Sequence, residues 1–250
     1  RNPHNLGAAA NYNLTFEYSS GIYFKWSAHD DLCAPTFLEK CVNELDRSPD
    51  VVLACPEILY INSDGKVIGE SPYNSVLETK SARSEIRFCS LMLSGCMNFQ
   101  CFGLMRSDAL RKTPLLGGYD AADQVLLAQL ALLGRFSEIP EKLFYYRLHP
   151  KQSINLGHDP VAYSAWFDPA NQGRIIFPHW RYFFEYWKSI LFADMSLKGR
   201  LYCHLQLARW ARWSAKRLRS DFKPALRQFR KLYLSGETAT QQADLNAIVE

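Results

Sequence analysis

Short apolar runs separated by polar and turn-forming residues dominate the first 155 positions of the chain. Aromatic and β-branched residues concentrate in these runs, which is typical of buried strands. Two of the runs flank the sequence Asn62-Ser63-Asp64-Gly65, whose residues favour a tight turn and therefore predict a β-hairpin. Strands are predicted at residues 22–26, 51–55, 101–105 and 143–147, with the hairpin formed by residues 58–61 and 66–68.

Other segments carry apolar residues at helical spacing. Asn5 is suited to cap a helix that runs to about Tyr18, and Pro35 is suited to the first turn of the next helix. Gly134 ends a third, strongly apolar helix. The predicted helices cover residues 5–18, 35–48, 85–93 and 125–133. Because strands and helices alternate, the pattern predicts an α/β sheet covered on both faces.

The pattern changes after about residue 155. Residues 153–178 contain several Gly, Pro and Asn residues and are predicted to form a loop. Aromatic-rich, basic helical stretches follow, and residues 235–250 form a polar tail. The sequence therefore predicts a domain at residues 1–155, a helical basic extension at 156–234 and a frayed tail at 235–250.

Charge is spread unevenly along the chain. Residues 174–231 contain fourteen Lys or Arg against three acidic residues, although the whole chain carries a net charge of only +4. On a helical wheel of residues 202–219, the basic and apolar residues lie on opposite sides. The basic side holds Arg209, Arg212, Lys216 and Arg219, and the apolar side holds Cys203, Leu207, Trp210 and Leu218.

Two interpretations of this basic amphipathic stretch stay open. Trp213 lies near the border of the polar side, a pattern suited to an anionic membrane surface. The alternative is a packed helical subdomain with a solvated basic face. No nucleic-acid-binding motif accompanies the stretch, so nucleic acid is not expected as a partner.

Composition narrows the classes of site and the cellular location that the chain can have. The seven cysteines form no CxxC pair and no Cys/His spacing of a zinc site, so buried thiols are expected. No apolar stretch reaches the length of a transmembrane helix, and no signal peptide is visible. These features predict a cytoplasmic chain, with a peripheral position at the inner face of the plasma membrane as the alternative.

Candidate chemistry begins at His29-Asp30-Asp31, directly after the first predicted strand. The carboxyl edge of an α/β sheet is where such proteins bind ligands. Mg²⁺ or Mn²⁺ prefers carboxylate oxygens and needs only one or two of them when substrate phosphates supply the rest. A solvated turn with an Asp that caps the following helix is the plainer interpretation of the same residues.

Two further positions are candidates. Asp123 follows the loop Gly117-Gly118-Tyr119-Asp120 and opens an apolar helix, so it is either a helix cap or a general base for an acceptor hydroxyl. His149 follows the last predicted strand and is either a hydrogen-bonded structural residue or a ligand.

The order and spacing of these motifs resemble family 2 glycosyltransferases over about residues 1–155. The N-terminal part of the resemblance lies in Asn5-x-Gly7-(x)3-Asn11, Gly21-x-Tyr23-Phe24-x-Trp26-(x)2-His29-Asp30-Asp31 and Pro35-x-Phe37-Leu38-Glu39. Later matches are Phe102-Gly103-Leu104, Asp123-(x)2-Leu126-Leu127, Gly134-Arg135-Phe136 and Pro140-Glu141-x-Leu143-Phe144-x-Tyr146-Arg147-x-His149.

The resemblance implies a GT-A (Rossmann-like) mixed sheet flanked by helices, here followed by the basic aromatic-rich extension. It also implies a divalent cation, Mg²⁺ or Mn²⁺, and a nucleotide-sugar donor linked to UDP or GDP. Asp30 and Asp31 fall on the acidic DxD-type motif that holds the cation and the donor, although His29 occupies a position that is often another Asp. Asn5 and Gly7 fall on the donor side.

Residue roles on the acceptor side follow from the same resemblance. Asp123 falls on the catalytic base of inverting members, although Ala122 precedes it where Glu is common. Gly117, Gly118 and Asp120 fall in the loop that approaches the acceptor. His149 falls on the histidine that joins Asp31 in the metal shell.

The predicted activity is inverting, metal-dependent sugar transfer to an acceptor glycan or lipid-linked saccharide in bacterial cell-envelope synthesis. Family members begin with a strand, a loop and a second strand that precede the position of Arg1, so the chain is expected to be a fragment that lacks this unit. The main alternative is a catalytically incompetent partial domain that serves as a membrane-associated binding or assembly module. A metal-dependent hydrolase that uses the same carboxylates ranks below both.

Overall fold

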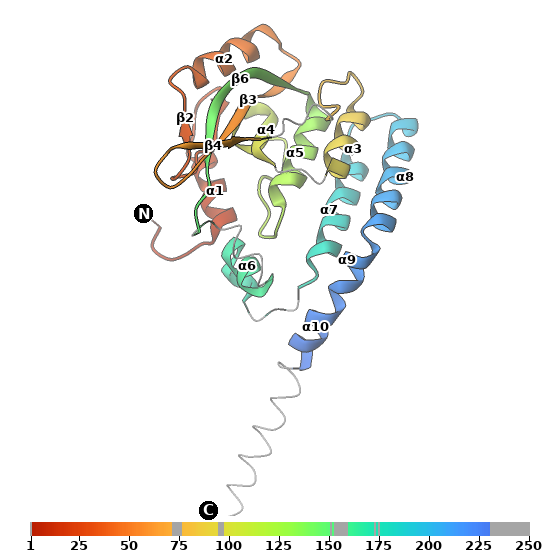
Figure 1. Cartoon of the computed structure of the whole chain (residues 1–250). Coiled ribbons are helices and arrows are strands. Elements are labelled where there is room, and N and C mark those ends of the chain that lie inside the picture. The colour runs from red at the N-terminus through yellow and green to blue at the C-terminus, as the bar shows by residue number, and fades with distance from the viewer. Residues whose placement is uncertain are drawn as a thin grey trace, which may run out of the picture.

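The computed structural model describes residues 2–71, 77–94, 98–150, 152, 160–172, 174 and 176–230. A mixed six-stranded sheet forms the centre of the molecule (Figure 1). The strands are β1 (Tyr23–Phe24), β2 (Leu32–Cys33), β3 (Val51–Ile61), β4 (Val67–Glu70), β5 (Leu104–Arg106) and β6 (Arg135–Arg147). Their order is β1-β5-β3-β6-β2, with β4 paired to β3. β3 and β6 run parallel, and the other pairs are antiparallel.

Helices cover both faces of the sheet, which confirms the predicted α/β fold. On one face, α2 (Phe37–Arg47) buries Phe37, Cys41 and Leu45 against β3 and β6. The other face carries α3 (Ser84–Ser94) and α5 (Ala122–Leu133), with α1 (Ala8–Glu17) and the short α4 (Ser107–Leu110) near its edge. Neighbouring residues of β5 serve opposite faces, since Leu104 joins the α2 side and Met105 joins the α5 side.

Several strand bounds differ from the prediction. Residues 51–55 and 58–61 form one strand, because the register between β3 and β6 shifts at Pro56 and so accommodates a residue that lacks an amide hydrogen. β6 begins at Arg135 rather than at residue 143, and its first half is polar on one face. Residues 101–105 divide into a 3-10 helix at Phe99–Phe102 and β5.

The starts of three helices also differ. Asn5 is not a helix cap, since α1 begins after Gly7, and the Asn5 side chain accepts a hydrogen bond from the Gly7 amide at 3.0 Å. Pro35 lies just before Thr36, the cap of α2, rather than in its first turn. The cap of α5 is Ala121 with a φ of 53°, so Asp123 lies inside the first turn instead of capping the helix.

Helices also form most of the described part of the extension. They are α6 (Pro160–Phe167), a 3-10 helix at Pro169–Asn171, α7 (Pro178–Phe192), α8 (Leu197–Trp213), α9 (Ala215–Ser220) and α10 (Phe222–Phe229). The prediction of a loop over 153–178 is therefore wrong for α6. Residues 153–159 and the predicted tail at 235–250 lie outside the described residues.

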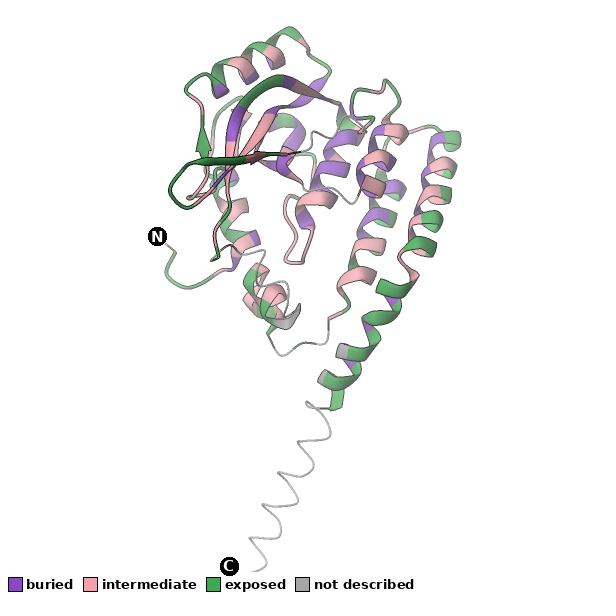
Figure 2. Ribbon diagram, viewed as in Figure 1, coloured by how far each residue is buried: buried purple, intermediate pink, exposed green. Residues whose placement is uncertain are grey.

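The extension shares its core with the sheet domain. Tyr186 and Ile190 of α7 and Cys203 and Leu207 of α8 are buried in the same apolar cluster as Phe88 of α3. Figure 2 shows buried residues on the inner sides of α7 and α8, and exposed residues along the outer sides of α8, α9 and α10. Among the described helices, none combines the length and the apolarity needed to cross a membrane.

Candidate active site

The acid pair Asp30-Asp31 lies in the turn that leads into β2, at the end of β6. Asp31 Oδ1 accepts a hydrogen bond from the Arg147 amide at 2.9 Å. Burial raises the pKa of Asp31, and the charge of Asp30 raises it further, while the hydrogen bond from Arg147 works in the opposite direction. Asp31 Oδ2 is buried without a hydrogen-bond partner, which is unusual because buried polar atoms are normally paired.

Arg147 fixes the position of this turn through main-chain oxygens. Its Nε donates to the Asp30 carbonyl at 2.7 Å, and Nη1 donates to the carbonyls of Asn62 and Ser63 at 2.9 Å each. His149 Nε2 lies 2.7 Å from Asp30 Oδ2. The structure therefore brings together Asp30, Asp31 and His149, three of the predicted site residues.

A cation at this place would have two carboxylates to bind. In the described part of the chain, no three His, Cys, Asp or Glu side chains are grouped as ligands for one metal ion. His149 contacts Asp30 directly, so the unpaired Oδ2 of Asp31 is the oxygen best placed to become a ligand. Because Mg²⁺ needs only one or two carboxylates beside substrate phosphates, the donor set fits such an ion in the presence of a diphosphate.

A second carboxylate, Asp123, lies in the first turn of α5. Its Oδ1 accepts the Gln124 amide at 2.8 Å. Burial raises the pKa of Asp123, hydrogen bonds from Gln124 and Asn98 oppose that shift, and the charge of Asp120 adds to it. Ala121, which lies between Asp120 and Asp123 in the sequence, has a left-handed backbone conformation. Backbone strain of this kind is frequent at functional sites.

Asp31 and Asp123 both act electrostatically on the buried Cys101. Burial raises the pKa of Cys101, and the charges of both Asp123 and Asp31 raise it further. Tyr146 of β6 is affected in the same way: burial, Asp31 and Asp30 raise its pKa to about 12. Cys101 therefore lies within the electrostatic reach of both Asp31 and Asp123.

Comparison with known proteins matches the N-terminal part of the chain to one family. The model of the family described as glycosyl transferase family 2 matches residues 1–113, which include Asn5, Gly7, Asp30 and Asp31. Residues 1–113 of the chain therefore resemble glycosyl transferase family 2. Asp120, Asp123 and His149 lie beyond the matched residues.

Two known proteins resemble the chain to different extents. An uncharacterized glycosyltransferase of Haemophilus influenzae is 26% identical over 159 residues, which are 62% of this chain and 49% of that protein. The chain thus spans about half the length of this curated relative. The crystal structure of S. aureus TarS 1-349 aligns with 89% of this chain and 59% of its own, at 15% identity and a TM-score of 0.44.

The extension holds the loop at Gly117-Gly118. Asn171 Nδ2 donates to the Gly118 carbonyl at 2.8 Å, and a Cβ at Gly118 would lie 2.8 Å from that of Asp168. On the other side, the Tyr182 hydroxyl donates to Asp120 Oδ2 at 2.5 Å. Glycine at position 118 is thus explained by close packing.

Close packing also explains why glycine occupies position 7. Its φ is 82°, and a Cβ there would lie 2.5 Å from the carbonyl oxygen of Phe167 in α6. Gly7 therefore allows the N-terminus of α1 to approach α6, and a part for Asn5 and Gly7 in donor binding stays a prediction.

Sequence reasoning missed the residues that the extension brings to this loop, above all Tyr163, Asn171 and Tyr182. The available signal was the aromatic group Tyr163, Trp166 and Phe167, which lies within the segment predicted to be a loop. Contacts such as Tyr182 to Asp120 join positions 62 residues apart, so local patterns give no sign of them.

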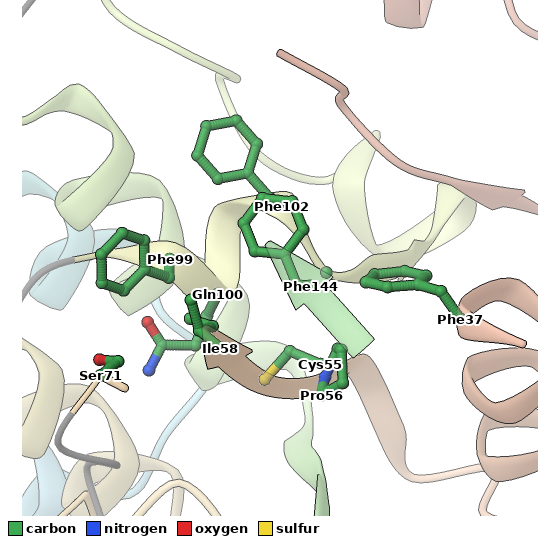
Figure 3. A pocket seen from close by; sticks show the side chains of 10 residues that line it. Phe37, Cys55, Pro56, Ile58, Ser71, Phe99, Gln100, Phe102 and Phe144 are labelled. Atoms are coloured by element: carbon green, nitrogen blue, oxygen red, sulfur yellow. The ribbon is translucent and has the colours of Figure 1, made fainter. Parts of the chain in front are cut away.

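An aromatic hollow is lined by residues of β3 and β6, among others (Figure 3). Phe99 lines it, and the Phe99 ring packs against that of Tyr146 with 4.8 Å between centroids. Among the described residues that line the hollow, none is a predicted site residue. They are Phe37, Cys55, Pro56, Ile58, Ser71, Phe99, Gln100, Phe102, Gly103 and Phe144.

Proposed function

We propose that this chain transfers a sugar from a nucleotide-sugar donor to an acceptor hydroxyl, with inversion at the anomeric carbon. The observation that carries the proposal is that Asp31, with a buried and unpaired side-chain oxygen, and the half-buried carboxylate of Asp123 both act electrostatically on Cys101. The match of residues 1–113 to glycosyl transferase family 2 supports it. Asp30 and Asp31 would hold the donor through Mg²⁺ or Mn²⁺, with His149 fixing Asp30, and Asp123 would act as the base.

The proposed reaction balances as a single displacement. A divalent cation held by Asp31 would offset negative charge on the departing diphosphate. Asp123 takes the proton of the acceptor hydroxyl, whose oxygen forms a bond to the anomeric carbon. The bond from that carbon to the phosphate oxygen breaks, and the nucleoside diphosphate leaves with the bonding electrons. Attack on the face opposite the leaving group inverts the configuration.

Calorimetric titration of UDP, and then of GDP, with and without Mn²⁺ tests the donor side. We expect binding to one nucleotide that depends on Mn²⁺ and weakens at least about tenfold in Asp31→Ala, because one metal-binding carboxylate is lost. Asp64→Ala, which removes an exposed acid from the β3–β4 turn, is the matched control and should bind normally.

Failure of both nucleotides to bind would contradict the donor role and favour the alternative of a partial domain that serves as a binding or assembly module. Binding and release of free sugar without transfer to any saccharide would favour the hydrolase instead. Acceptor glycans or lipid-linked saccharides of the bacterial cell envelope are the substrates proposed for the transferase.

We also propose that the extension docks on an anionic membrane surface from the cytoplasmic side. Bulky apolar side chains are exposed on α7, α8 and α10, among lysines and arginines that are exposed as well. The apolar members are Phe184, Trp187, Leu191, Phe192, Leu197, Leu201, Leu205, Trp213, Phe222, Leu226 and Phe229. The inner sides of α7 and α8 pack on the sheet domain. The alternative of a packed helical subdomain therefore explains these inner sides, but not the exposed apolar side chains. Basic helices with exposed Leu, Phe and Trp are suited to anionic lipid.

Flotation with phosphatidylcholine vesicles, with and without phosphatidylglycerol, tests the docking. Binding is expected only to the anionic vesicles, and Arg209→Glu with Arg212→Glu should weaken it at least about tenfold, at roughly 1 kcal/mol per basic residue. Lys66→Glu reverses an exposed charge on the β3–β4 turn and should leave flotation unchanged. Equal loss in both variants, or equal binding to neutral vesicles, would contradict the proposal.

A further inference from the structure

Helix α6 contacts both the start of α1 and, through Asn171, the loop at Gly117-Gly118. Its last residue, Phe167, packs against Gly7 at the start of α1, as the 2.5 Å approach described above requires. On the other side, Asn171 Nδ2 donates both to the Gly118 carbonyl at 2.8 Å and to the Ser164 carbonyl at 3.2 Å. Figure 1 shows α6 beneath α1. The helix is therefore tied to the donor-side helix α1 and to the loop that precedes Asp123.

This helix carries three aromatic rings that support one another. The ring planes of Tyr163 and Trp166 are nearly parallel, with an angle of 10° and 6.1 Å between centroids. Phe167 packs edge-on against both, at 5.1 Å from Tyr163 and 4.9 Å from Trp166. Trp166 nevertheless remains 37% exposed, although large aromatic side chains gain most when they are covered.

Tyr163 lies on the helix that Asn171 ties to the acceptor loop through the carbonyls of Gly118 and Ser164. Burial raises the pKa of Tyr163 strongly, and the charges of Asp120, Asp123 and Tyr146 raise it further. For Tyr146, by contrast, the charges of Asp30 and Asp31 are the ones that raise the pKa. The Tyr163 phenol is therefore within electrostatic reach of the acids of the acceptor loop.

We infer that Tyr163 and Trp166 form the acceptor subsite, in which the apolar face of a pyranose ring stacks on Trp166 and a sugar hydroxyl contacts the Tyr163 phenol. The inference rests on the proposed sugar transfer and adds the residues of the extension that would bind the saccharide acceptor. An exposed ring on a helix anchored to the Gly118 loop can hold a saccharide whose hydroxyl points toward Asp123. Tyr163 adds the polar contact that fixes orientation.

Saturation-transfer NMR with p-nitrophenyl glycosides tests saccharide binding without requiring turnover. We expect transfer to the sugar ring protons in the wild-type chain, weakened about tenfold in apparent affinity by Trp166→Ala. Tyr163→Phe should keep the stacking and lose part of the affinity. Trp187→Ala is the matched control, since Trp187 is 40% exposed but lies on α7 outside this cluster.

The outcomes separate the subsite from the activity. Normal UDP or GDP binding in Trp166→Ala with weakened saccharide binding supports the inference. Unchanged saccharide signals in Trp166→Ala, or equal losses in Trp166→Ala and Trp187→Ala, would overturn it while the proposed transfer stands. Saccharide binding that depends on Trp166 in a chain that binds neither nucleotide would uphold the subsite and reject the transfer.

Discussion

Asp123→Asn is expected to lower turnover about a hundred- to ten-thousand-fold, the usual contribution of a general base. The amide can accept the same backbone hydrogen bond from Gln124, but it cannot take a proton from the acceptor. Nucleotide binding should persist, since the acid pair is untouched. Initial rates with the nucleotide identified by calorimetry, measured beside nucleotide affinity, check the prediction.

The pH dependence gives this variant an internal control. Burial raises the pKa of Asp123 above its ordinary 3.8, so the acidic limb of kcat/KM should lie above that value. Because the pKa of Asp123 is raised in the folded state, its protonated form contributes stability that is fully present below pH 3.8. This stability is lost as the pH rises through the folded-state pKa. At neutral pH, the buried charge then costs stability that Asn avoids. A variant that is less stable at neutral pH would mean that lost activity reflects damaged folding, and unchanged activity would exclude Asp123 as the base.

Phe88→Ala should lower the free energy of unfolding by about 3–5 kcal/mol, the range for a buried Phe replaced by Ala. Phe88 is fully buried in α3, and its ring packs edge-on against Tyr186 of α7 at 6.0 Å between centroids. The cavity therefore opens between the sheet domain and the extension. Urea titration followed by tryptophan fluorescence and by far-UV circular dichroism measures the loss.

The same titration tests whether the extension unfolds separately. Because both parts share one buried cluster, a single transition is expected, with Trp26 near the sheet and Trp210 in α8 reporting together. Phe192→Ala is the control, since Phe192 is 86% exposed and its loss should change stability by less than about 0.5 kcal/mol. Two separated transitions would instead support an independent unit after residue 155.

Strong local signals explain which elements the sequence predicted. The hairpin around Asn62-Ser63-Asp64-Gly65 is confirmed, because its turn residues act locally: the Asn62 side chain accepts the amides of Asp64 and Lys66. Helices α2, α3 and α5 are confirmed within a few residues at their ends. Their apolar spacing is regular, and a buried face enforces that spacing.

Tertiary context explains the errors. Residues 51–55 and 58–61 are predicted as two strands on either side of Pro56. The shifted pairing with β6 lets both segments belong to the single strand β3. The Gly, Pro and Asn residues around α6 predict a loop, although Pro160 begins that helix at a position where proline is tolerated. The contact between His149 and Asp30 depends on the pairing of β2 with β6, so only the family resemblance could suggest that these residues act together.

Arg147 has a consequence for how this protein can diverge. Its side chain binds the main-chain oxygens of Asp30, Asn62 and Ser63, and every amino acid supplies such an oxygen. Side chains such as that of Ser63 can therefore drift without loosening the acid turn, provided that the arginine is kept. Lysine lacks the planar fork that reaches several carbonyls at once, so it is a poor replacement. The geometry beside Asp31 thus depends on Arg147, while the side chain at position 63 is free to vary among descendants.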